Sequence, residues 1–330
     1  MAKTAFVTGA AGFVGRNLVE VLLKEHWSVH ALVRSAAPAW MQQHGLTVRQ
    51  GALEDAASVA AAMPARADAV FHLAGNTSMW SGDAQRLLRD NVAATQGLLD
   101  AAHQRQARRV VMTSTLGVFQ DSDGRIHEHT PLQPSTIRNP YLRTKLLADA
   151  LLSEAARKGL SVVSLHPAHI LGPYDASGWI GLFDDAAQGK MRAAPRGRAS
   201  FCGVSAVARA HIAAATHPAP ARRYVLGGED ASYLQVFADV ARRVHAKPVA
   251  STVPNSVLTT VAALAHIGAL FSDKKPSITP GLAAVLTRTM LADSRLAQKD
   301  LGYPMLRLSE MLDATQVYWD ARQASSHSRR

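Results

Sequence analysis

A tyrosine and a lysine four residues apart could carry out acid–base chemistry in this chain. Tyr141 and Lys145 belong to a Tyr-Leu-Arg-Thr-Lys segment, and on a helix this spacing places both side chains on one face, one turn apart. A free tyrosine, with a pKa of about 10, is a poor acid–base catalyst at neutral pH, whereas a nearby ammonium favours the phenolate and lowers that pKa. We therefore expect Tyr141 to act as a general acid/base that Lys145 tunes.

Hydroxyl side chains precede this pair at the end of an apolar run. Thr113, Ser114 and Thr115 follow Val-Val-Met, a segment typical of a buried strand. A hydroxyl at that position can donate a hydrogen bond to a substrate carbonyl while hydride reaches its carbon. Tyr-x-x-x-Lys pairs occur on many helices by chance, and the position after this strand is what makes the pattern specific.

Three glycines near the N-terminus have the spacing of a dinucleotide-binding turn. Gly9, Gly12 and Gly15 follow an apolar strand and precede a helix, which is the context in which such glycines bind phosphate. Gly9 would allow the tight turn, Gly12 the approach of a pyrophosphate, and Gly15 the close packing of the helix on the sheet. The first gap is one residue longer than in G-x-G-x-x-G, and the alternative is a glycine turn without a ligand.

The end of the second expected strand indicates which dinucleotide binds. Arg34 follows Ala-Leu-Val there, where an NAD site usually has Asp or Glu for the ribose hydroxyls. An arginine can instead form charge-assisted hydrogen bonds with the 2′-phosphate of NADP. We therefore favour NADP(H) over NAD(H), with an ordinary surface arginine as the alternative.

The order of apolar runs and helix-like stretches predicts an α/β fold, a doubly wound parallel (Rossmann) sheet with a smaller C-terminal substrate-binding domain. The expected strands cover residues 4–8, 28–33, 47–50, 69–73, 109–114 and 160–165. The expected helices cover residues 15–24, 57–63, 84–104 and 141–158.

The character of the chain changes after Gly172-Pro173, where loops rich in Gly, Pro and Ser begin. We therefore assign residues 1–172 to an NAD(P)-binding domain and residues 173–330 to a substrate-binding domain. Within the second part, residues 201–226 are expected to return to the first domain. Such a second domain would cover the carboxyl ends of the strands, where ligands of these folds bind.

Taken together, these segments resemble the extended short-chain dehydrogenase/reductase superfamily, within its NAD-dependent epimerase/dehydratase family. The branch that they resemble most contains dihydroflavonol reductases and 3β-hydroxysteroid dehydrogenases. The likeness extends over nearly the whole chain and is most specific in the first 175 residues. The matching motifs lie at residues 8–15, 70–75, 91–95, 111–115, 141–145 and 166–173, with weaker ones at 201–210 and 291–303.

The resemblance implies a role for each matched position. Tyr141 would be the general acid/base, Lys145 its partner, and Thr115 the hydroxyl that binds the carbonyl, with Ser114 in reserve. Phe13 and Val14 would offer backbone N–H groups to the pyrophosphate, Leu53 would lie against adenine, Ala74 and Gly75 near the ribose, and Pro167 near the nicotinamide. The residues expected at the cofactor are Gly9, Gly12, Phe13, Val14, Gly15, Arg34, Leu53, Ala74, Gly75, Tyr141, Lys145 and Pro167.

The chain also departs from the family pattern. Ala52 stands where Asp is frequent, Ala94 replaces a glycine, and His166 stands where Arg is usual. Ser205-Ala206 replaces an Asp pair in the later motif. Leu116-Gly117 occupies the place where sugar-nucleotide dehydratases carry Asp-Glu, which argues against elimination of water.

These features predict an NADP(H)-dependent oxidoreductase that interconverts a carbonyl and a secondary alcohol on a small, hydrophobic substrate. The segment after residue 173 is rich in apolar residues and shows no basic clamp for a nucleotide sugar. One alternative is a sugar epimerase that retains its cofactor. Another is a non-catalytic dinucleotide sensor, although a sensor would not need the proton donor.

The composition of the chain limits which partners we expect it to bind. The net charge is +11, but the arginines are scattered and no nucleic-acid motif appears, so we expect no nucleic-acid partner. We expect no metal at His127-Glu128-His129, because the loop offers no further ligand, and we expect the single Cys202 to be a packing residue in a cytoplasmic protein.

Two further contacts stay open. The 15-residue apolar stretch 257–271 is too short to span a bilayer. We expect it to be a buried or pocket-covering helix, with peripheral membrane contact as the alternative. The family resemblance also implies a homodimer through paired helices.

Overall fold

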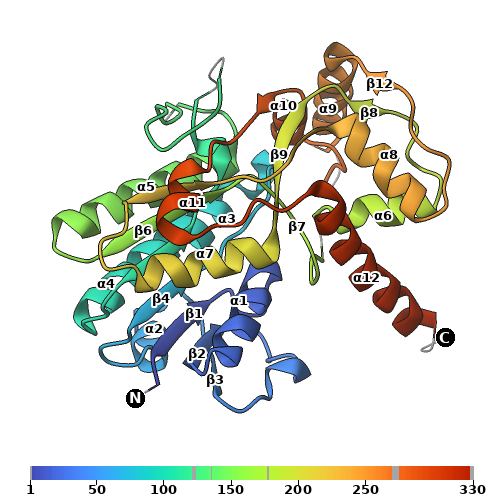
Figure 1. Ribbon diagram of the computed structural model, residues 1–330. Coiled ribbons are helices and arrows are strands. Elements are labelled where there is room, and N and C mark those ends of the chain that lie inside the picture. The colour runs from blue at the N-terminus through green and yellow to red at the C-terminus, as the bar shows by residue number, and fades with distance from the viewer. Residues whose placement is uncertain (1, 121–123, 135, 177, 270–274, 328–330) are drawn as a thin grey trace.

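The computed structural model describes residues 2–120, 124–134, 136–176, 178–269 and 275–327. In that part of the chain, seven parallel strands form one sheet in the order β10-β6-β5-β4-β1-β2-β3 (Figure 1). The prediction of a doubly wound parallel sheet is confirmed. The strands are β1 (Thr4–Thr8), β2 (Ser28–Val33), β3 (Leu46–Gln50), β4 (Ala69–His72), β5 (Val110–Thr113), β6 (Val162–Pro167) and β10 (Arg223–Leu226).

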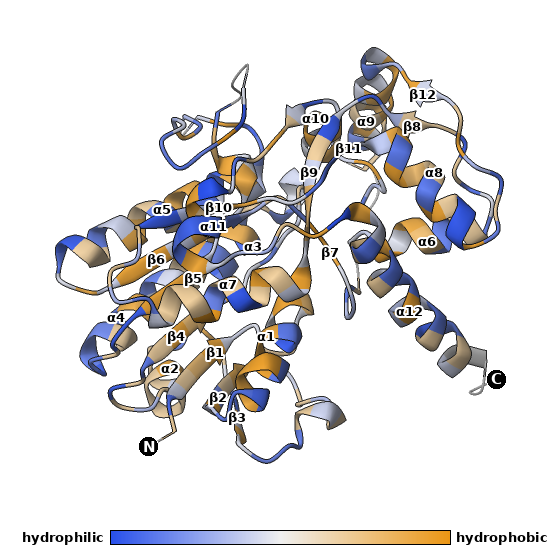
Figure 2. Cartoon of the chain, viewed as in Figure 1, coloured by the Kyte–Doolittle hydropathy of each residue, from blue (hydrophilic) through white to orange (hydrophobic). Residues whose placement is uncertain are grey.

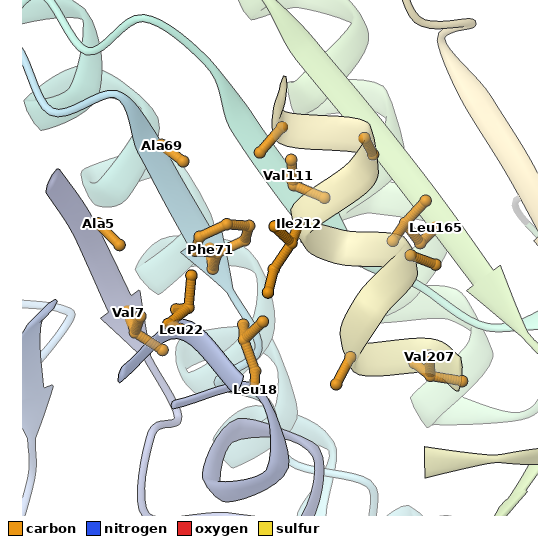
Figure 3. Packing of buried hydrophobic residues seen from close by; sticks show 14 of the residues in the cluster. Ala5, Val7, Leu18, Leu22, Ala69, Phe71, Val111, Leu165, Val207 and Ile212 are labelled. Atoms are coloured by element: carbon orange, nitrogen blue, oxygen red, sulfur yellow. The ribbon is translucent and has the colours of Figure 1, made fainter. Parts of the chain in front are cut away.

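Helices cover both faces of this sheet, because its strands are apolar on both sides. One face packs on α1 (Phe13–Lys24) and α7 (Val204–Thr216), and Figure 3 shows the buried side chains from these helices meeting those of β1, β4, β5 and β6. The other face packs on α2 (Ala56–Ala62), α4 (Ala94–Gln104) and α5 (Pro140–Arg157). In Figure 2 the central strands are mostly hydrophobic in colour, whereas the outer helices carry hydrophilic segments.

The expected helix 84–104 is interrupted by a π-helical stretch. The structure divides it into α3 (Ala84–Leu87), the π-helical η3 (Leu88–Ala93) and α4. π-Helical turns are rare and concentrate at functional sites, and this one carries the buried Asn91 toward the carboxyl edge of the sheet. Three short 3₁₀ turns complete this half: η1 (Ala39–Met41), η2 (Ser81–Asp83) and η4 (Leu116–Val118).

Later segments contribute to the sheet layer. β10 pairs with β6, and α7 packs against α1. In addition α11 (Arg295–Leu301), which the sequence did not place on this layer, contacts both α7 and β10. The chain therefore crosses between its two halves more than once.

The remaining elements cover the carboxyl end of the sheet (Figure 1). Two small sheets form there, one in which β9 pairs with β7, β11 and β13, and one that joins β8 to β12. Their strands are β7 (His169–Leu171), β8 (Ala194–Pro195), β9 (Arg198–Gly203), β11 (Asp230–Ser232), β12 (Thr252–Val253) and β13 (Thr289–Met290). The helices are α6 (Ile180–Ala187), α8 (Tyr233–Arg243), α9 (Asn255–Ala269), α10 (Pro280–Leu286) and α12 (Leu308–His327).

The apolar stretch 257–271 differs from its expectation. Its residues 257–269 lie in α9, where Leu264 is 63% exposed, while residues 270 and 271 lie outside the described residues. The expectation of a buried or pocket-covering helix is wrong for the described part, because α9 contacts its neighbours along a narrow side and none of its residues lines the large cavity described below. Within the residues that the structure describes, no helix combines the length and apolar character needed to cross a bilayer.

Candidate active site

The glycine turn closes tightly against the next strand of the sheet. Gly9 has a φ of +71°, a conformation that favours glycine, and a Cβ there would lie 2.5 Å from the Ala74 backbone nitrogen. A Cβ on Gly15 would lie 2.0 Å from the Gly9 carbonyl oxygen. Gly12 caps α1 and donates its N–H to that same oxygen at 2.9 Å. The turn therefore leaves the first N–H groups of α1, from Phe13 onward, without helical partners and available to an anion.

A large cavity opens where the strand order reverses between β1 and β4, as expected for this fold. Its volume is about 1410 Å³, which exceeds the usual range for one drug-sized ligand of about 300–1,000 Å³. The space therefore fits a dinucleotide together with a substrate. The expected cofactor residues on its lining are Gly9, Gly12, Arg34, Leu53, Ala74 and Gly75.

Arg34 lies at the end of β2 on the rim of this cavity. Its side chain is exposed and shares the rim with Ser35 and Ala36. No Asp or Glu occupies positions 33–36. Glu54 is the acid of the β3–α2 connection that also lines the cavity. An arginine and a serine on this rim can bind a phosphate.

The catalytic candidates come from three elements that meet under the cavity. Asn139 caps α5 through a hydrogen bond from Leu142 N, so the helix begins at Pro140 and places Tyr141 and Lys145 in its first two turns. Lys145 Nζ donates to the Thr113 carbonyl oxygen at 2.9 Å. The Thr115 side chain hydrogen-bonds Tyr141. The structure thus brings together the three residues that the sequence assigned to catalysis.

Burial controls the protonation of this pair. Tyr141 and Lys145 are 8% and 9% exposed. Desolvation raises the pKa of Tyr141 to about 12, with the hydrogen bond from Thr115 acting in the opposite direction. Desolvation lowers the pKa of Lys145 to about 8, while the charge of Asp149 raises it. The tyrosine is therefore protonated over the neutral range. The expected lowering of its pKa by Lys145 is not found, because burial raises that pKa and the opposing contribution comes from Thr115.

Seven of the expected residues do not line the cavity, but the surroundings of Gly75 show that one of them, Lys145, lies close to it. A Cβ on Gly75, which does line it, would be 3.4 Å from Lys145 Nζ. Lys145 therefore lies close behind the cavity wall. The residues set back from the lining are Phe13, Val14, Gly15, Thr115, Tyr141, Lys145 and Pro167.

A buried carboxylate below the lysine was missed by the sequence reasoning. Asp149 lies one turn beyond Lys145 on α5 and is 5% exposed. It accepts hydrogen bonds from Ser114 Oγ at 2.9 Å and Ser164 Oγ at 2.8 Å. The i,i+4 spacing from Lys145 could have identified it. Because the Ser114 hydroxyl is used in this way, Thr115 is the hydroxyl that remains beside Tyr141.

His166 extends this network. Since Ser164 donates its proton to Asp149, the 2.6 Å contact between Ser164 Oγ and His166 Nε2 requires the imidazole to donate. The ring is fully buried, its pKa is lowered by desolvation, and its Nδ1 lies 3.4 Å from the Thr115 carbonyl oxygen. The histidine that stands in place of the family's arginine is therefore a neutral ring with its proton on Nε2, joined to Asp149 through Ser164, and its Nδ1 has no proton to donate to the Thr115 carbonyl oxygen.

A second buried network joins the strand ends on the other side of the lysine. His72 contacts Thr8 Oγ1 at 2.8 Å and Thr95 Oγ1 at 2.9 Å, and Thr95 Oγ1 donates to the Asn91 carbonyl oxygen. Burial lowers the pKa of His72 to about 3, so the ring is neutral and links β1 and β4 to the π-helical η3. Sequence patterns give no signal for a π-helical turn, which is why this link was missed.

Asn91 joins that network to α5. Its Oδ1 accepts from Asn76 N at 2.7 Å, and its Nδ2 donates to the Asn76 carbonyl oxygen and to Thr144 Oγ1 at 2.9 Å each. These bonds fix the loop after β4, which continues directly into the cavity lining. Asn91 therefore sets the position of that loop relative to α5.

The wall opposite the glycine turn is largely apolar. Met79 and Trp80, in the segment after β4, line the cavity. Trp179 and Leu182 line it as well, whereas Ile180 and Phe183 are buried in the core of the second part. The other apolar wall residues are Phe237, Leu282, Val285 and Leu286.

Few polar side chains interrupt this wall. Lys275 donates to Ser78 Oγ at 2.8 Å and lies 3.8 Å from Asp83, which joins the far side of the cavity to the loop after β4. His169 contacts Tyr233 Oη through Nε2 at 2.9 Å, and burial lowers its pKa to about 4. The polar groups on this wall therefore include a neutral imidazole, the paired cation of Lys275 and the carboxylate of Asp185.

Two other sequence candidates lie apart from the site. Glu128 Oε1 accepts from Val225 N at 2.9 Å, and the described residues contain no cluster of three or more metal-ligating side chains. Cys202 is 1% exposed, and burial raises the pKa of its thiol to about 12.

Comparison with known proteins gives the class of this site. Residues 5–227 match the model of the NAD dependent epimerase/dehydratase family, and the chain belongs to that family. It is 32% identical to sterol demethylase protein B of Methylococcus capsulatus over 239 residues, which are 71% of this chain and 72% of that protein. A putative dihydroflavonol 4-reductase of Synechocystis is 29% identical over 97% of this chain and 95% of its own length.

Two further likenesses differ in the molecules that their names mention. A 4-hydroxy-2-methyl-3-oxo-4-farnesyl-3,4-dihydroquinoline-1-oxide ketoreductase of Stigmatella aurantiaca is 30% identical over 90% of this chain and 91% of its length. The solved structure of MoeE5 in complex with UDP-glucuronic acid and NAD is 26% identical, with a TM-score of 0.75 over 97% of this chain and 99% of that one. Relatives also include 3β-hydroxysteroid dehydrogenases. The predicted branch is confirmed, and the chain is an NAD(P)-dependent oxidoreductase of the extended short-chain type.

Proposed function

We propose that this protein is an NADP(H)-dependent reductase that interconverts a ketone or aldehyde and its alcohol on a small, hydrophobic substrate. The observation that carries the proposal is the Thr115, Tyr141 and Lys145 cluster directly behind a cavity whose far wall is apolar. The sequence-based roles of the cofactor residues are part of this proposal.

The chain's own residues divide the work. Tyr141 gives its hydroxyl proton to the carbonyl oxygen, and Thr115 donates a hydrogen bond to the same oxygen. Lys145 stabilises the tyrosinate that remains and binds the ribose hydroxyls. When bound, NADPH supplies the hydride to the carbonyl carbon. Proton and hydride together give the alcohol, and in oxidation each transfer reverses.

Arg34 supports the choice of NADP. Arg34 lies on the cavity rim. Positions 33–36 contain no Asp or Glu that could bind the ribose hydroxyls of NAD. We expect Arg34→Ala to weaken NADPH binding about 10- to 100-fold, the loss of a charge-assisted hydrogen bond, and to leave NADH binding unchanged. Arg49→Ala is the matched control, because Arg49 is an exposed arginine on β3 that does not line the cavity.

The wall supports an apolar substrate. Its side chains are two tryptophans, a phenylalanine, a methionine and several aliphatic residues, and its cations Lys275 and Arg86 are both paired with acids. A nucleotide-sugar diphosphate would need unpaired cations there. Two relatives have a sterol or a farnesyl group in their names, which also favours an apolar substrate.

A sugar epimerase is the second candidate, because the MoeE5 structure holds a UDP-sugar and NAD. An epimerase that retains its cofactor shows no net consumption of NADPH. The deciding experiment follows absorbance at 340 nm with NADPH or NADH and a panel of apolar ketones, aldehydes and UDP-sugars. Carbonyl-dependent loss of NADPH absorbance is expected, and conversion of a UDP-sugar without cofactor turnover would overturn the proposal.

Two broader expectations belong to the proposal. A cytoplasmic location agrees with the buried, unpaired Cys202, which suits a reducing compartment. A homodimer through paired helices rests on the family resemblance, and light scattering of the purified protein measures it.

A further inference from the structure

One side of α9 presents apolar side chains to solvent. Val257, Val261, Leu264 and Ile267 are 48%, 49%, 63% and 52% exposed. Their spacing of four, three and three residues places them along one side of the helix, and we call them the α9 stripe. The helix, residues 255–269, contains no Asp, Glu, Lys or Arg. A surface helix of a globular protein normally carries charged residues on its solvent side, so this face is unusual for a protein–water boundary.

The opposite side of α9 joins it to the substrate wall. Ala262 and Ala269 are buried, and α9 packs against α10. Asn255 Nδ2 donates to the Thr287 carbonyl oxygen at 3.4 Å, which fixes the start of α9 to the end of α10. α10 in turn lines the cavity with Leu282, Val285 and Leu286. The stripe and the cavity therefore belong to the same helical pair.

The segments that adjoin α9 are positively charged. β8 pairs with β12, which leads into α9, and Arg196 Nε contacts Thr252 Oγ1 on β12 at 3.4 Å. Figure 1 shows β8, β12 and α9 at the same end of the molecule. Residues 186–198, 244–269 and 275–292, all described, contain no Asp or Glu. Apart from Lys275, which is paired at the cavity, their cations are Lys190, Arg192, Arg196, Arg198, Lys247 and Arg288.

We propose that the α9 stripe docks on the surface of an anionic lipid membrane. An aliphatic stripe on a helix whose adjoining segments carry cations and no acids matches the two parts of such a surface, because the stripe would enter the acyl boundary while Lys and Arg meet the headgroups. The helix lies in the plane of the interface and does not cross it.

A second copy of this chain fits the stripe less well. A stable protein interface buries about 800 Å² on each partner and includes directional hydrogen bonds. The stripe offers four aliphatic side chains on a 15-residue helix and no charged group for specific pairing. A lipid surface accepts apolar side chains without directional hydrogen bonds or specific charge pairs.

Vesicle sedimentation tests the proposal without reference to catalysis, so its failure is distinguishable from failure of the proposed reductase activity. The full-length protein is mixed with vesicles of phosphatidylcholine and phosphatidylglycerol in equal parts, or of phosphatidylcholine alone. We expect binding to the anionic vesicles that weakens in high salt and is much weaker on neutral ones. Leu264→Asp should lower the vesicle-bound fraction about tenfold or more, as expected when a buried leucine contact is lost.

A matched variant controls for the added charge. Val317→Asp alters a side chain that is 70% exposed on α12 and should leave vesicle binding unchanged. Ile267→Asp is the second variant on the stripe, and thermal melting checks that each variant folds. Equal binding by wild type and both stripe variants, or no binding by wild type, would overturn the proposal. So would a dimer, seen by light scattering, that Leu264→Asp dissociates.

Discussion

The glycine turn and the apolar wall face each other across one cavity, and they are built in different ways. The turn is defined by backbone geometry within seven residues, where a Cβ on Gly15 would lie 2.0 Å from the Gly9 carbonyl oxygen. The wall gathers side chains from separated segments, such as Trp80, Trp179 and Phe237. The turn tolerates almost no added atom, whereas the wall can change its residues and keep its apolar character.

This difference separates general chemistry from specificity. Buried polar contacts join β1 to β4 through Thr8 and His72, and they join α5 to β5 and β6 through Lys145 and Asp149. The wall contacts α5 at its beginning, where Asn139 Nδ2 donates to the Gly281 carbonyl oxygen at 3.4 Å. The wall therefore meets α5 at its N-cap, whereas Lys145 and Asp149 are held by bonds to β5, β6 and Ser114.

The largest expected effect comes from filling the glycine turn. Gly15→Ala forces apart the first turn of α1 and the Gly9 peptide, so dinucleotide affinity should fall about 100-fold or more, which corresponds to about 3 kcal/mol. Fluorescence titration with NADPH measures it. Gly124→Ala is the control, since a Cβ there meets nothing within 4 Å. Retained affinity in Gly15→Ala would mean that the turn does not depend on this close contact.

An intermediate effect is expected from the buried carboxylate. The pKa of Lys145 is about 8, lowered by burial and raised by the charge of Asp149. Asp149→Asn removes that charge and lowers the pKa further, so Lys145 should lose its proton at lower pH. The neighbouring His72 and His166 stay neutral through burial.

The measurement is the pH profile of kcat/KM for carbonyl reduction. Activity should fall as pH rises through about 8 in the wild type, and in Asp149→Asn the fall should begin about one pH unit lower, with about tenfold less activity on the alkaline side. Ser164→Ala removes one hydrogen bond to the carboxylate but keeps its charge. A shift of the same size in Ser164→Ala would show that hydrogen bonding, not charge, sets the profile.

The smallest effect is expected at the wall. Phe237→Ala removes apolar area from the cavity and should raise KM for a hydrophobic carbonyl about five- to tenfold while kcat stays nearly constant. Steady-state kinetics separates the two constants, and Val317→Ala on α12 serves as an exposed control. A large fall in kcat with unchanged KM would place Phe237 in the chemical step and remove the distinction between the two regions.

The sequence predicts the first half of the chain better than the part that forms the apolar wall. β1 and β2 begin and end at the expected residues, because a strand buried on both faces is a continuous apolar run between turn residues. Gly9, Tyr141 and Lys145 were identifiable because fixed local spacing carries their chemistry. Asp149 and His166 act through contacts that join α5 to β6, and only their identities, not their partners, are visible in the sequence.

The second part could be predicted less well. Trp179 and Phe183 lie four residues apart in similar apolar surroundings, yet one lines the cavity and the other is core. The apolar pattern of α9 predicts burial, and the structure exposes Leu264, because hydropathy alone does not state which surface a helix meets. The return of α11 to the sheet depends on long-range contacts that have no local signal.

The most direct test is Tyr141→Phe, which removes one oxygen and leaves Thr115 and Lys145 in place. NADPH oxidation at saturating carbonyl substrate and NADPH affinity are measured on the same preparation, with Tyr318→Phe as the control. Turnover should fall about 100-fold or more while NADPH affinity stays unchanged, because the hydroxyl supplies only the proton. Unchanged turnover in Tyr141→Phe would contradict the assignment of the proton donor and the proposed reaction with it.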